Sequence, residues 1–329
     1  MSSKFLYADD NKRYHSLFYY NKHRFGHRVY KAVLNGGFTC PNLDGTKGFQ
    51  GCAFCDGGSG AFTKALPLQQ QLELELSRIR KQNPDAKAIA YFQVHTNTYA
   101  PVDTLRSLFE QAIRFPDMIG ISIGTRPDCL PDDILDYLSD LNQRTYLTVE
   151  LGVQTVHDRT AQAFGRGYQY SEFLESYQKL QDLKIRTCLH IIDGLYQENL
   201  SDMLRTAEIL GKLKPQAVKI QLLHVLKETR YEKLYQSGIY MPMTQEDYIS
   251  TVVKQLEYFP PETVIERLTG DGEKAKLLAP LWSMDKIRTL GNIDKLQVQL
   301  DTWQGKNFYQ RLARKPPLLK RGDELRPFS

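Results

Sequence analysis

The sequence predicts an α/β fold, in which a parallel sheet curls into an incomplete (β/α)6 barrel and an α-rich C-terminal extension follows. Apolar segments of strand length alternate with segments whose apolar residues recur every three or four positions, and this alternation is typical of parallel sheets covered by helices. The predicted strands are 28–33, 88–94, 119–124, 146–154, 186–192 and 217–222. Six strands are too few for a complete eight-stranded barrel, which takes about 250 residues.

Helical patterns fill the intervals between these strands. One such face carries Leu68, Leu72, Leu76 and Ile79, and similar faces fall within 105–113, 134–141, 173–180 and 204–210. We expect Ser201 to cap the last of these helices, and Thr244 with Asp247 to open another beyond the barrel. The chain is divided into a basic and aromatic N-terminal segment (1–27), a partial barrel (28–238) and a C-terminal extension with a basic tail (239–329).

Composition narrows the class of protein. Of the 329 residues, 41% are hydrophobic and 25% are charged, which are ordinary values for a globular protein, and the net charge is a mild +5. The first residues form no apolar signal segment, and no apolar run reaches the length of a membrane span. We therefore expect a cytoplasmic protein without membrane contact. Five cysteines in that setting indicate metal or redox chemistry.

Three of the cysteines lie in one glycine-rich loop after the first predicted strand. Cys40, Cys52 and Cys55 have the spacing C-x11-C-x2-C, whereas Cys129 and Cys188 are distant in the sequence. Thiolates bind zinc and iron–sulfur clusters, but a structural zinc site needs four protein ligands. Three thiolates on a four-iron cluster leave one iron open for another ligand, so a cluster is favoured over zinc. A disulfide between Cys52 and Cys55 would require an oxidising compartment.

This loop resembles the cluster motif of the radical S-adenosylmethionine (SAM) enzymes, in the wide-spaced form of Elp3-like proteins. The resemblance implies a [4Fe–4S] cluster bound by Cys40, Cys52 and Cys55, with SAM on the open iron. It also implies reductive cleavage of SAM to a 5′-deoxyadenosyl radical, and an incomplete barrel as the fold. No catalytic side chain is assigned beyond these ligands.

The resemblance extends to segments that follow the second and third strands. Gln93, in the segment 92–98, lies where several radical SAM enzymes contact the SAM amino group, although the glycines usual there are missing. Arg126 belongs to a Thr-Arg-Pro-Asp segment that is similar to one in Elp3-like tRNA-modifying enzymes. A guanidinium binds carboxylate or phosphate, so Arg126 is a candidate for either the SAM carboxylate or substrate phosphate. The alternative is a structural pair with Asp128.

Further candidate SAM contacts lie on the fourth and fifth strands. Gln154 and Arg166 resemble contacts in the coproporphyrinogen-oxidising branch of the superfamily, with the amide on a ribose hydroxyl and the guanidinium on a carboxylate. Glu150 shares a strand face with Gln154, and is a second ribose candidate or a partner for Arg126. His190 opens a segment that resembles the family's ribose- and adenine-contacting strand.

Basic and aromatic residues are interleaved over 12–31, a pattern that single-stranded nucleic acid favours. The expected phosphate contacts are Arg13, Lys22, Arg24, Lys315, Lys320 and Arg321, and the expected stacking residues are Tyr14, Phe18, Tyr19 and Tyr20. We expect them to present a tRNA anticodon arm at the barrel mouth. The alternative is an amphipathic segment that covers one end of the barrel.

Taken over the whole chain, the sequence resembles the YtqA/YhcC group of Elp3-like radical SAM proteins, without the acetyltransferase domain of Elp3. The resemblance implies a step in tRNA wobble-uridine modification, from 5-carboxymethylaminomethyl to 5-aminomethyl, before a separate tRNA methyltransferase acts. It also implies an electron donor such as flavodoxin or ferredoxin. Two alternatives are a radical SAM enzyme acting on a small molecule or tetrapyrrole, and a zinc-stabilised RNA-binding protein.

Overall fold

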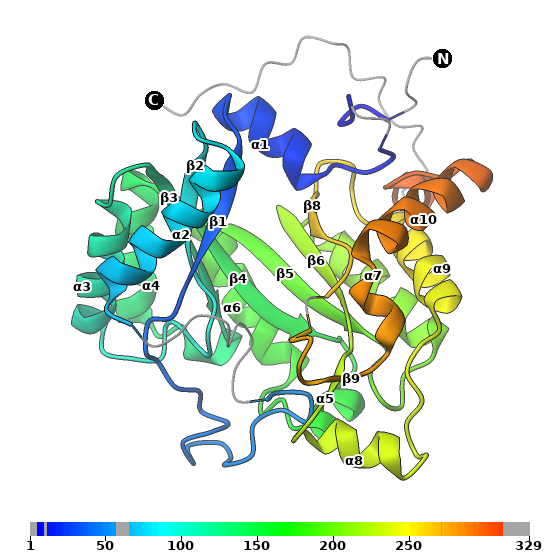
Figure 1. The fold of residues 1–329 in the computed structure, drawn as a ribbon. Helices are drawn as coiled ribbons and strands as arrows, with labels where there is room; N and C mark the ends of the chain where they lie inside the picture. Colours follow the sequence, from blue (N-terminus) through cyan, green and yellow to red (C-terminus); the bar gives the residue numbers. More distant parts are fainter. Residues whose placement is uncertain (1–4, 10–11, 57–65, 271, 312–329) are drawn as a thin grey trace.

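A computed structural model describes residues 5–9, 12–56, 66–270 and 272–311. Its centre is a seven-stranded sheet in the order β1-β2-β3-β4-β5-β6-β8, in which all neighbouring strands are parallel. The strands are β1 (Val29–Leu34), β2 (Lys87–Phe92), β3 (Met118–Thr125), β4 (Tyr146–Gln154), β5 (Arg186–Asp193), β6 (Ala217–Leu222) and β8 (Val264–Arg267). The sheet curls into an incomplete barrel with helices outside (Figure 1), so the predicted fold class is confirmed.

The predicted strands and helices are present at nearly the predicted positions. The α-helices are α1 (Leu17–Phe25), α2 (Leu68–Gln82), α3 (Val102–Ile113), α4 (Asp132–Arg144), α5 (Asp158–Phe164), α6 (Tyr170–Asp182), α7 (Leu200–Lys212), α8 (Arg230–Gln236), α9 (Gln245–Leu256), α10 (Lys286–Gln299) and α11 (Lys306–Arg311). Thr244 caps α9 as predicted. The predicted Ser201 cap is wrong, because Asn199 accepts hydrogen bonds from the backbone N–H groups at the start of α7.

The seventh strand, β8, comes from the C-terminal extension. Its residues, Val264–Arg267, are not among the six predicted strands. Only Val264 and Ile265 of this strand are apolar, and they follow two prolines and a polar pair. Two apolar residues are too few for the sequence pattern to predict a strand. Pairing with β6 extends the sheet beyond the predicted six strands.

The two faces of the sheet have opposite character. Residues such as Ile121, Val149 and Leu189 point outward and join the main apolar core beneath the helices. Their neighbours Ser122, Glu150 and His190 alternate with them and point into the barrel, as successive residues on a strand must. The barrel interior is therefore polar and partly charged, whereas apolar packing between the sheet and the outer helices stabilises the fold.

The first edge of the sheet is covered by side chains of α2. Gln71 accepts a hydrogen bond from the Asn35 backbone N–H at 2.8 Å and donates one to its carbonyl at 2.9 Å. Glu75 accepts from the Val33 backbone N–H at 2.9 Å. Residues 71 and 75 lie one helical turn apart on the same face. They occupy backbone groups that a further strand would otherwise use.

The opposite edge is covered by the segment that precedes α1. The backbone N–H of Ile265 on β8 donates to the carbonyl of His15 at 2.7 Å, and Ser16 forms a parallel bridge with Ile265. Helix α1 then crosses the end of the barrel where the strands begin (Figure 1). There the Tyr20 ring lies 5.0 Å from the Arg186 guanidinium, at the first residue of β5.

The structure thus confirms the alternative interpretation of the N-terminal segment, as a cover for one barrel end. The segment lies at the other end of the strands from the mouth, which does not favour its presenting RNA there, and RNA binding itself stays a prediction. Tyr14 is buried, Lys22 pairs with Asp9 at 2.6 Å, and Arg13 pairs with Asp301 at 3.0 Å. The tail cations Lys315, Lys320 and Arg321 lie outside the described residues.

The remaining elements lie partly at the mouth and partly on the outside of the sheet. A two-stranded antiparallel ribbon joins β7 (Val225–Leu226) to β9 (Leu277–Ala279), and α9 packs between α7 and α10. Two 3-10 turns complete the structure, at Pro127–Cys129 and Leu281–Met284. Among the described residues, no helix is both long enough and apolar enough to span a membrane.

Candidate active site

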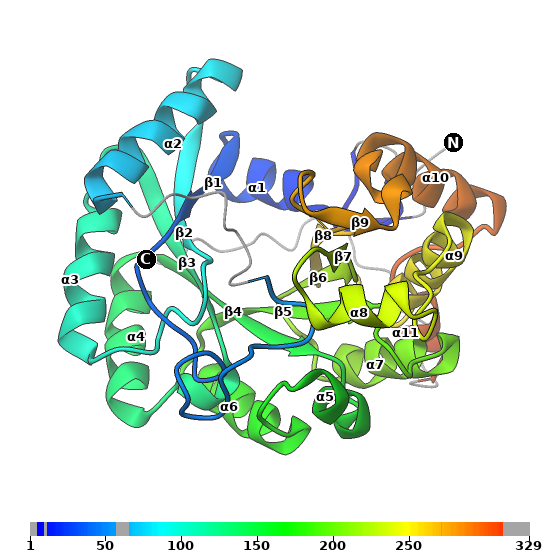
Figure 2. The same ribbon diagram turned by 60° about the horizontal axis from the view of Figure 1, so that its bottom comes forward.

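The cysteine loop lies at the carboxyl end of the strands. It follows β1 and passes in front of the barrel mouth, beside α5 and α8 (Figure 2). Cys40, Cys52 and Cys55 are all free thiols and are half-buried. This is the edge at which parallel α/β sheets place their chemistry, because the loops after successive strands converge there.

Hydrogen bonds to two other segments hold the loop in place. The Asn42 amide donates to the backbone carbonyls of Gly165 and Arg166 at 2.9 and 3.0 Å, and to the Cys52 sulfur at 3.4 Å. Arg230, the first residue of α8, donates to the carbonyls of Gly51 and Phe164 at 3.1 and 2.9 Å. The loop is therefore fixed to the turn after α5 and to α8 before any cofactor binds.

Glycines make this close approach possible. Gly167 has a φ of +80°, and a Cβ there would lie 2.6 Å from the Asn42 side-chain oxygen. Such a contact is too short for real atoms, and the backbone conformation favours glycine as well. The Phe164-Gly165-Arg166-Gly167 turn is thus shaped to receive the cysteine loop.

Arg126 lies between the cysteine loop and the third strand. Its guanidinium pairs with both carboxylate oxygens of Asp128, at 2.9 and 2.8 Å, and donates to the Arg166 carbonyl at 3.0 Å. One of its nitrogens also lies 4.0 Å from the Cys40 sulfur. The structural pair with Asp128 is confirmed, whereas Glu150 as a partner for Arg126 is wrong. Arg126 places a permanent positive charge beside a thiol.

The three thiols are close enough to influence one another. Burial, with a smaller contribution from the neighbouring Cys55 and Cys40, raises the pKa of the Cys52 thiol to about 11, although Arg126 and the Asn42 amide act to lower it. A group that binds these thiols as thiolates must therefore supply positive charge of its own. Iron in a cluster does so.

The distances between the three sulfur atoms also distinguish a zinc site from an iron–sulfur cluster. Two sulfurs on one zinc, each about 2.3 Å from the metal, cannot lie more than about 4.6 Å apart. Among the described residues, the set of three ligand atoms that all lie within 4.8 Å of one another is Glu150, Cys188 and His190, and not the three loop cysteines. The wider arrangement of the three loop cysteines fits an iron–sulfur cluster, in which each thiolate binds a different iron. Phe54 packs on Phe164, with ring centroids 5.3 Å apart, and adds an apolar wall.

Gln93 and Gln154 both lie at the carboxyl ends of their strands. Gln93 directly follows β2, and its half-buried side chain has no hydrogen-bond partner among the described residues. Gln154 ends β4 at a bulge, with a φ of +56°. Its amide folds back over Gly152 and contacts the Tyr168 hydroxyl at 3.2 Å. The Gln93 amide is therefore available to a ligand at the barrel mouth, whereas Gln154 would exchange its contact with Tyr168 for one with a ligand.

Arg166 is placed differently from the expectation. Its side chain is 1% exposed and donates to the carbonyls of Tyr168, Val153 and Thr155 at 2.7–3.0 Å, and to the Asp158 carboxylate at 3.0 Å. Four of the five guanidinium N–H groups are used in this way. In this structure Arg166 braces the loop after β4, and it does not project into the mouth as a free cation.

Glu150 lies inside the barrel, below the mouth, at the centre of a buried ion network. Its side chain is 0% exposed and forms ion pairs with the ammonium groups of Lys31 and Lys219. It also accepts hydrogen bonds from Ser122 at 2.6 Å and Tyr91 at 2.8 Å. Although burial raises the pKa of Glu150, the two lysines outweigh burial and hold this pKa well below its usual range.

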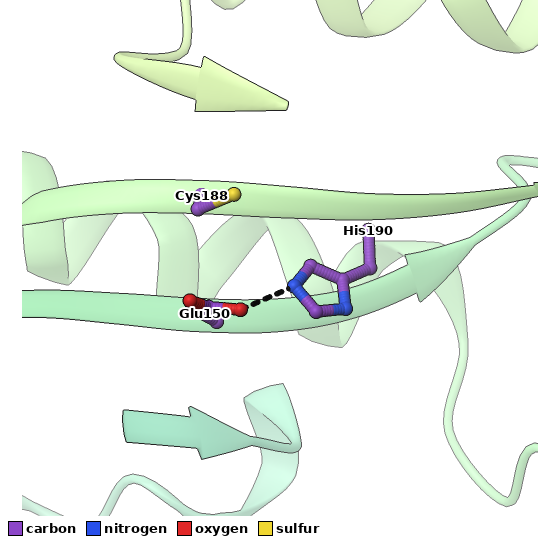
Figure 3. A group of neighbouring side chains, drawn as sticks. All are labelled: Glu150, Cys188 and His190. Carbon is purple, nitrogen blue, oxygen red and sulfur yellow. Dashed lines mark hydrogen bonds and ion pairs between the residues drawn. The ribbon is translucent and has the colours of Figure 1, made fainter. Parts of the chain in front are cut away.

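His190 stands between this network and the mouth. Its Nε2 lies 2.7 Å from Glu150 (Figure 3), and its Nδ1 lies 3.3 Å from the Gln221 amide nitrogen. Since the carboxylate can only accept, Nε2 carries the proton and Nδ1 accepts from Gln221. Burial, reinforced by the charge of Lys219, lowers the pKa of His190. The imidazole is thus neutral and fixed in one tautomer.

The close grouping of Glu150, Cys188 and His190 invites comparison with a metal site. However, the Glu150 oxygens already bind two ammonium groups, and burial raises the pKa of the Cys188 thiol well above its usual range. A further cation would be repelled by Lys31 and Lys219 and would find no thiolate. These three residues therefore belong to the barrel floor.

Sequence reasoning missed several of these residues. Lys31 is the last base of the basic and aromatic segment 12–31, but it joins β1 to β8 through Glu266 at 2.7 Å and is mostly buried. Lys219 and Tyr91 were not singled out, although a lysine or tyrosine within a buried strand is a signal that it has a partner. Nothing in the sequence marks Asn42 beyond its place in the loop, because the backbone carbonyls that its amide binds lie more than 120 residues away.

Comparison with known proteins agrees with this geometry. The sequence model of the radical SAM superfamily matches residues 47–210, and that of the radical SAM C-terminal domain matches 215–297. The chain is 45% identical to YtqA of Bacillus subtilis (strain 168), over 96% of this chain and 99% of YtqA. It is 33% identical to YhcC of Escherichia coli (strain K12), over 83% and 88% of the two chains.

A solved structure shares the fold. Elp3 of Methanocaldococcus infernus aligns with a TM-score of 0.65 at 15% identity, over 87% of this chain and 68% of that one. The family models and the extensive identity to YtqA show that the protein is an enzyme whose cofactors are SAM and a [4Fe–4S] cluster. A zinc-stabilised RNA-binding protein without radical chemistry is therefore the wrong alternative. The chain belongs to the radical SAM superfamily, in the group that contains YtqA and YhcC.

Proposed function

We propose that Cys40, Cys52 and Cys55 hold the [4Fe–4S] cluster, and that SAM binds between this loop and the carboxyl ends of β2, β4 and β5. The observation that carries the proposal is that three half-buried thiols, and no fourth, lie in the loop that passes in front of the barrel mouth. When bound, the cluster and SAM supply a 5′-deoxyadenosyl radical that abstracts a hydrogen atom from the substrate.

The protein's own residues prepare this site in three ways. Asn42 and Arg230 fix the loop, so that the thiols are arranged in advance. Arg126 and the Asn42 amide stabilise negative charge on sulfur. Gln93 and Gln154 offer amide groups for the polar parts of SAM, and His190, held in its tautomer by Glu150, would contact SAM through Nδ1 in place of Gln221. Arg166 then serves the site by bracing the Gln154 loop.

Gly152 provides a test of the Gln154 contact. A Cβ at position 152 would lie 2.4 Å from the Gln154 amide nitrogen, so Gly152→Ala should displace this amide without touching SAM itself. We expect Gly152→Ala and Gln154→Ala to weaken SAM binding by a similar amount, about 0.5–1.5 kcal/mol, as for one ordinary hydrogen bond. Calorimetry on the reconstituted protein measures the affinity.

Gln69→Ala, a change of the same type on the exposed face of α2, is the matched control and should leave SAM affinity unchanged. Arg166→Ala should lower the melting temperature as well as SAM affinity, because three buried carbonyls lose their donor. If Gly152→Ala and Gln154→Ala both bind SAM as tightly as the unaltered protein, the contact does not exist.

For the substrate, we propose a tRNA wobble uridine, in the step from 5-carboxymethylaminomethyl to 5-aminomethyl. The support is the resemblance of the cysteine spacing and the Thr125–Asp128 segment to Elp3-like tRNA-modifying enzymes. The N-terminal cations no longer add support, because they lie at the other end of the barrel. RNA loops can splay their bases outward, which would bring a uridine side chain into the mouth.

Mass analysis of tRNA nucleosides tests this substrate. Deletion of the gene should remove 5-aminomethyl-type uridines and accumulate the 5-carboxymethylaminomethyl form, and the unaltered gene should restore them where a Cys55→Ala gene does not. An unchanged profile, in cells without another enzyme for the step, would contradict tRNA and favour a small molecule or tetrapyrrole. We further propose flavodoxin or ferredoxin as the electron donor and a tRNA methyltransferase as the enzyme of the next step.

A further inference from the structure

The most exposed aromatic residue lies inside the cysteine loop. Phe49 is 80% exposed, and Phe18 is 49% exposed. All other aromatic residues whose side chains the structure describes are buried or half-buried. An aromatic ring stabilises a fold mainly through the apolar surface that it buries, so the fold gains little from the ring of Phe49. A partner that covered this ring would gain the contact instead.

The loop holds Phe49 in a fixed place. Before Phe49, the backbone N–H of Lys47 donates to the carbonyl of Pro41 at 2.8 Å. After it, the backbone N–H of Gly51 donates to the carbonyl of Asn42 at 2.8 Å. The backbone on both sides of Phe49 is thus tied to the start of the loop. A ring on such a preorganised backbone loses less conformational freedom when it binds a partner.

Gly45 lets the ring lie close against the loop. The φ of Gly45 is +95°, and a Cβ there would lie 2.5 Å from the nearest ring carbon of Phe49. That separation is shorter than real atoms allow, and the backbone conformation also favours glycine. One edge of the ring therefore rests against the backbone of Gly45, while most of the residue remains in solvent.

Two contacts fix this part of the loop to the rim of the barrel mouth. Lys47 pairs with Asp128, in the turn after β3, at 2.7 Å. The hydroxyl groups of Thr46 and Tyr99 lie within hydrogen-bond distance at 2.8 Å, which joins the loop to the segment after β2. Phe49 therefore belongs to the rim past which a substrate would enter the mouth (Figure 2).

The surroundings of the ring favour a nucleobase over a protein surface. Within the stretch 44–51, every residue other than Phe49 is glycine, polar or charged. The anchor residues of protein interfaces are surrounded by further contacts that exclude water, and this stretch provides no second apolar side chain for such a ring of contacts. An unpaired base needs only the face of one aromatic ring, and RNA loops expose such bases.

We propose that Phe49 stacks on an unpaired base of the substrate RNA and thereby positions the RNA loop at the barrel mouth. This inference rests on the proposed function, since it takes a tRNA wobble uridine as the substrate. The stacked base is a neighbour of that uridine, because the uridine side chain must enter the mouth whereas Phe49 lies on the rim. Phe49 is thus a binding residue that does not touch the reacting atoms.

The test is titration of the reconstituted full-length protein with a synthetic anticodon stem–loop RNA in which 2-aminopurine replaces one loop base at a time. Stacking quenches the fluorescence of 2-aminopurine, so the measurement reports affinity and ring contact without SAM cleavage. We expect Phe49→Ala to weaken binding about 5- to 150-fold, as for the loss of one stacked base, and to abolish the quenching at one loop position. Phe49→Trp should retain both.

The matched control is Phe18→Ala, which removes the other exposed phenylalanine, in α1 at the opposite end of the barrel, and should leave binding unchanged. A duplex RNA without unpaired bases should not distinguish Phe49→Ala from the unaltered protein. If the stem–loop binds Phe49→Ala as tightly as it binds Phe18→Ala, the inference is wrong and the proposed substrate stands. If the unaltered protein binds no stem–loop, the proposed substrate is contradicted as well.

A protein partner for the ring would give a different result. Slower reduction of the cluster by reduced flavodoxin in Phe49→Ala, with unchanged RNA affinity, would assign Phe49 to an electron donor and overturn the proposal. Circular dichroism and the visible absorption of the cluster report whether the variant is folded and loaded. Should Phe49→Ala fail either check, Phe49→Leu, which keeps an apolar side chain without a ring, must show the weakened binding or the proposal fails.

Discussion

Replacing Cys40, Cys52 or Cys55 by Ala is expected to abolish SAM cleavage. With two thiolates left, the cluster loses one of its three protein ligands, and neither Cys129 nor Cys188 lies in the loop to replace it. The readout is 5′-deoxyadenosine formed by reconstituted protein under anaerobic reducing conditions, together with iron content and the visible absorption of the cluster. Each single variant should fall to the background of the assay.

The matched control is Cys188→Ala. Cys188 is a buried thiol on the inner face of β5, outside the cysteine loop, and its removal should cost some stability without loss of cleavage. Full activity in any of the three loop variants would refute the ligand assignment. Loss of activity in all four would indicate that the assay reports folding, which circular dichroism of each variant separates from loss of the cluster.

Glu150→Gln is expected to destabilise the fold by about 3–5 kcal/mol, as is typical when one partner of a buried ion pair is removed. The substitution keeps the shape of the side chain but leaves the ammonium groups of Lys31 and Lys219 without their shared carboxylate. Because the side chain is fully buried, water cannot compensate for the lost charge. Urea denaturation of the purified protein measures the loss.

Asp140→Asn serves as the control, because the Asp140 side chain is 54% exposed and its pair with Arg144 should contribute no more than about 1 kcal/mol. The double variant Glu150→Gln, Lys219→Met removes one of the stranded cations along with the carboxylate. It should therefore lose less stability than the sum of the two single variants. A loss below about 1 kcal/mol in Glu150→Gln would show that the network is not what holds the barrel floor.

The sheet was predictable because six of its strands carry long apolar runs that the outer helices must cover. Tyr146–Gln154 and Arg186–Asp193 are such strands, and both were located to within a residue. The seventh strand was missed since Val264–Arg267 contributes only two apolar residues and is ordered by its pairing with β6. The apolar pattern of the sequence predicts strands that are buried in the core. A short edge strand forms because it pairs with its neighbour, and this pairing leaves no pattern in the sequence.

The residues of the candidate site were likewise predictable only in part. The cysteine loop was found because its ligands are close together in the sequence. The ion network of Lys31, Glu150 and Lys219 was not, because its members lie about 70 to 190 residues apart and each alone resembles a surface charge. Tyr20 illustrates the reverse error. Its aromatic ring suggested a stacking surface for RNA, but the cation beside it is the protein's own Arg186.

Both margins of the sheet are already occupied by the chain itself, by Gln71 and Glu75 on β1 and by His15 on β8. A second molecule cannot dock there by adding a strand, so self-association of this protein would have to use helix surfaces. The same protection removes the usual starting point for cross-β aggregation. Although the barrel is half-open, the edges of its sheet are thus not free to pair with the sheet of another copy of the protein.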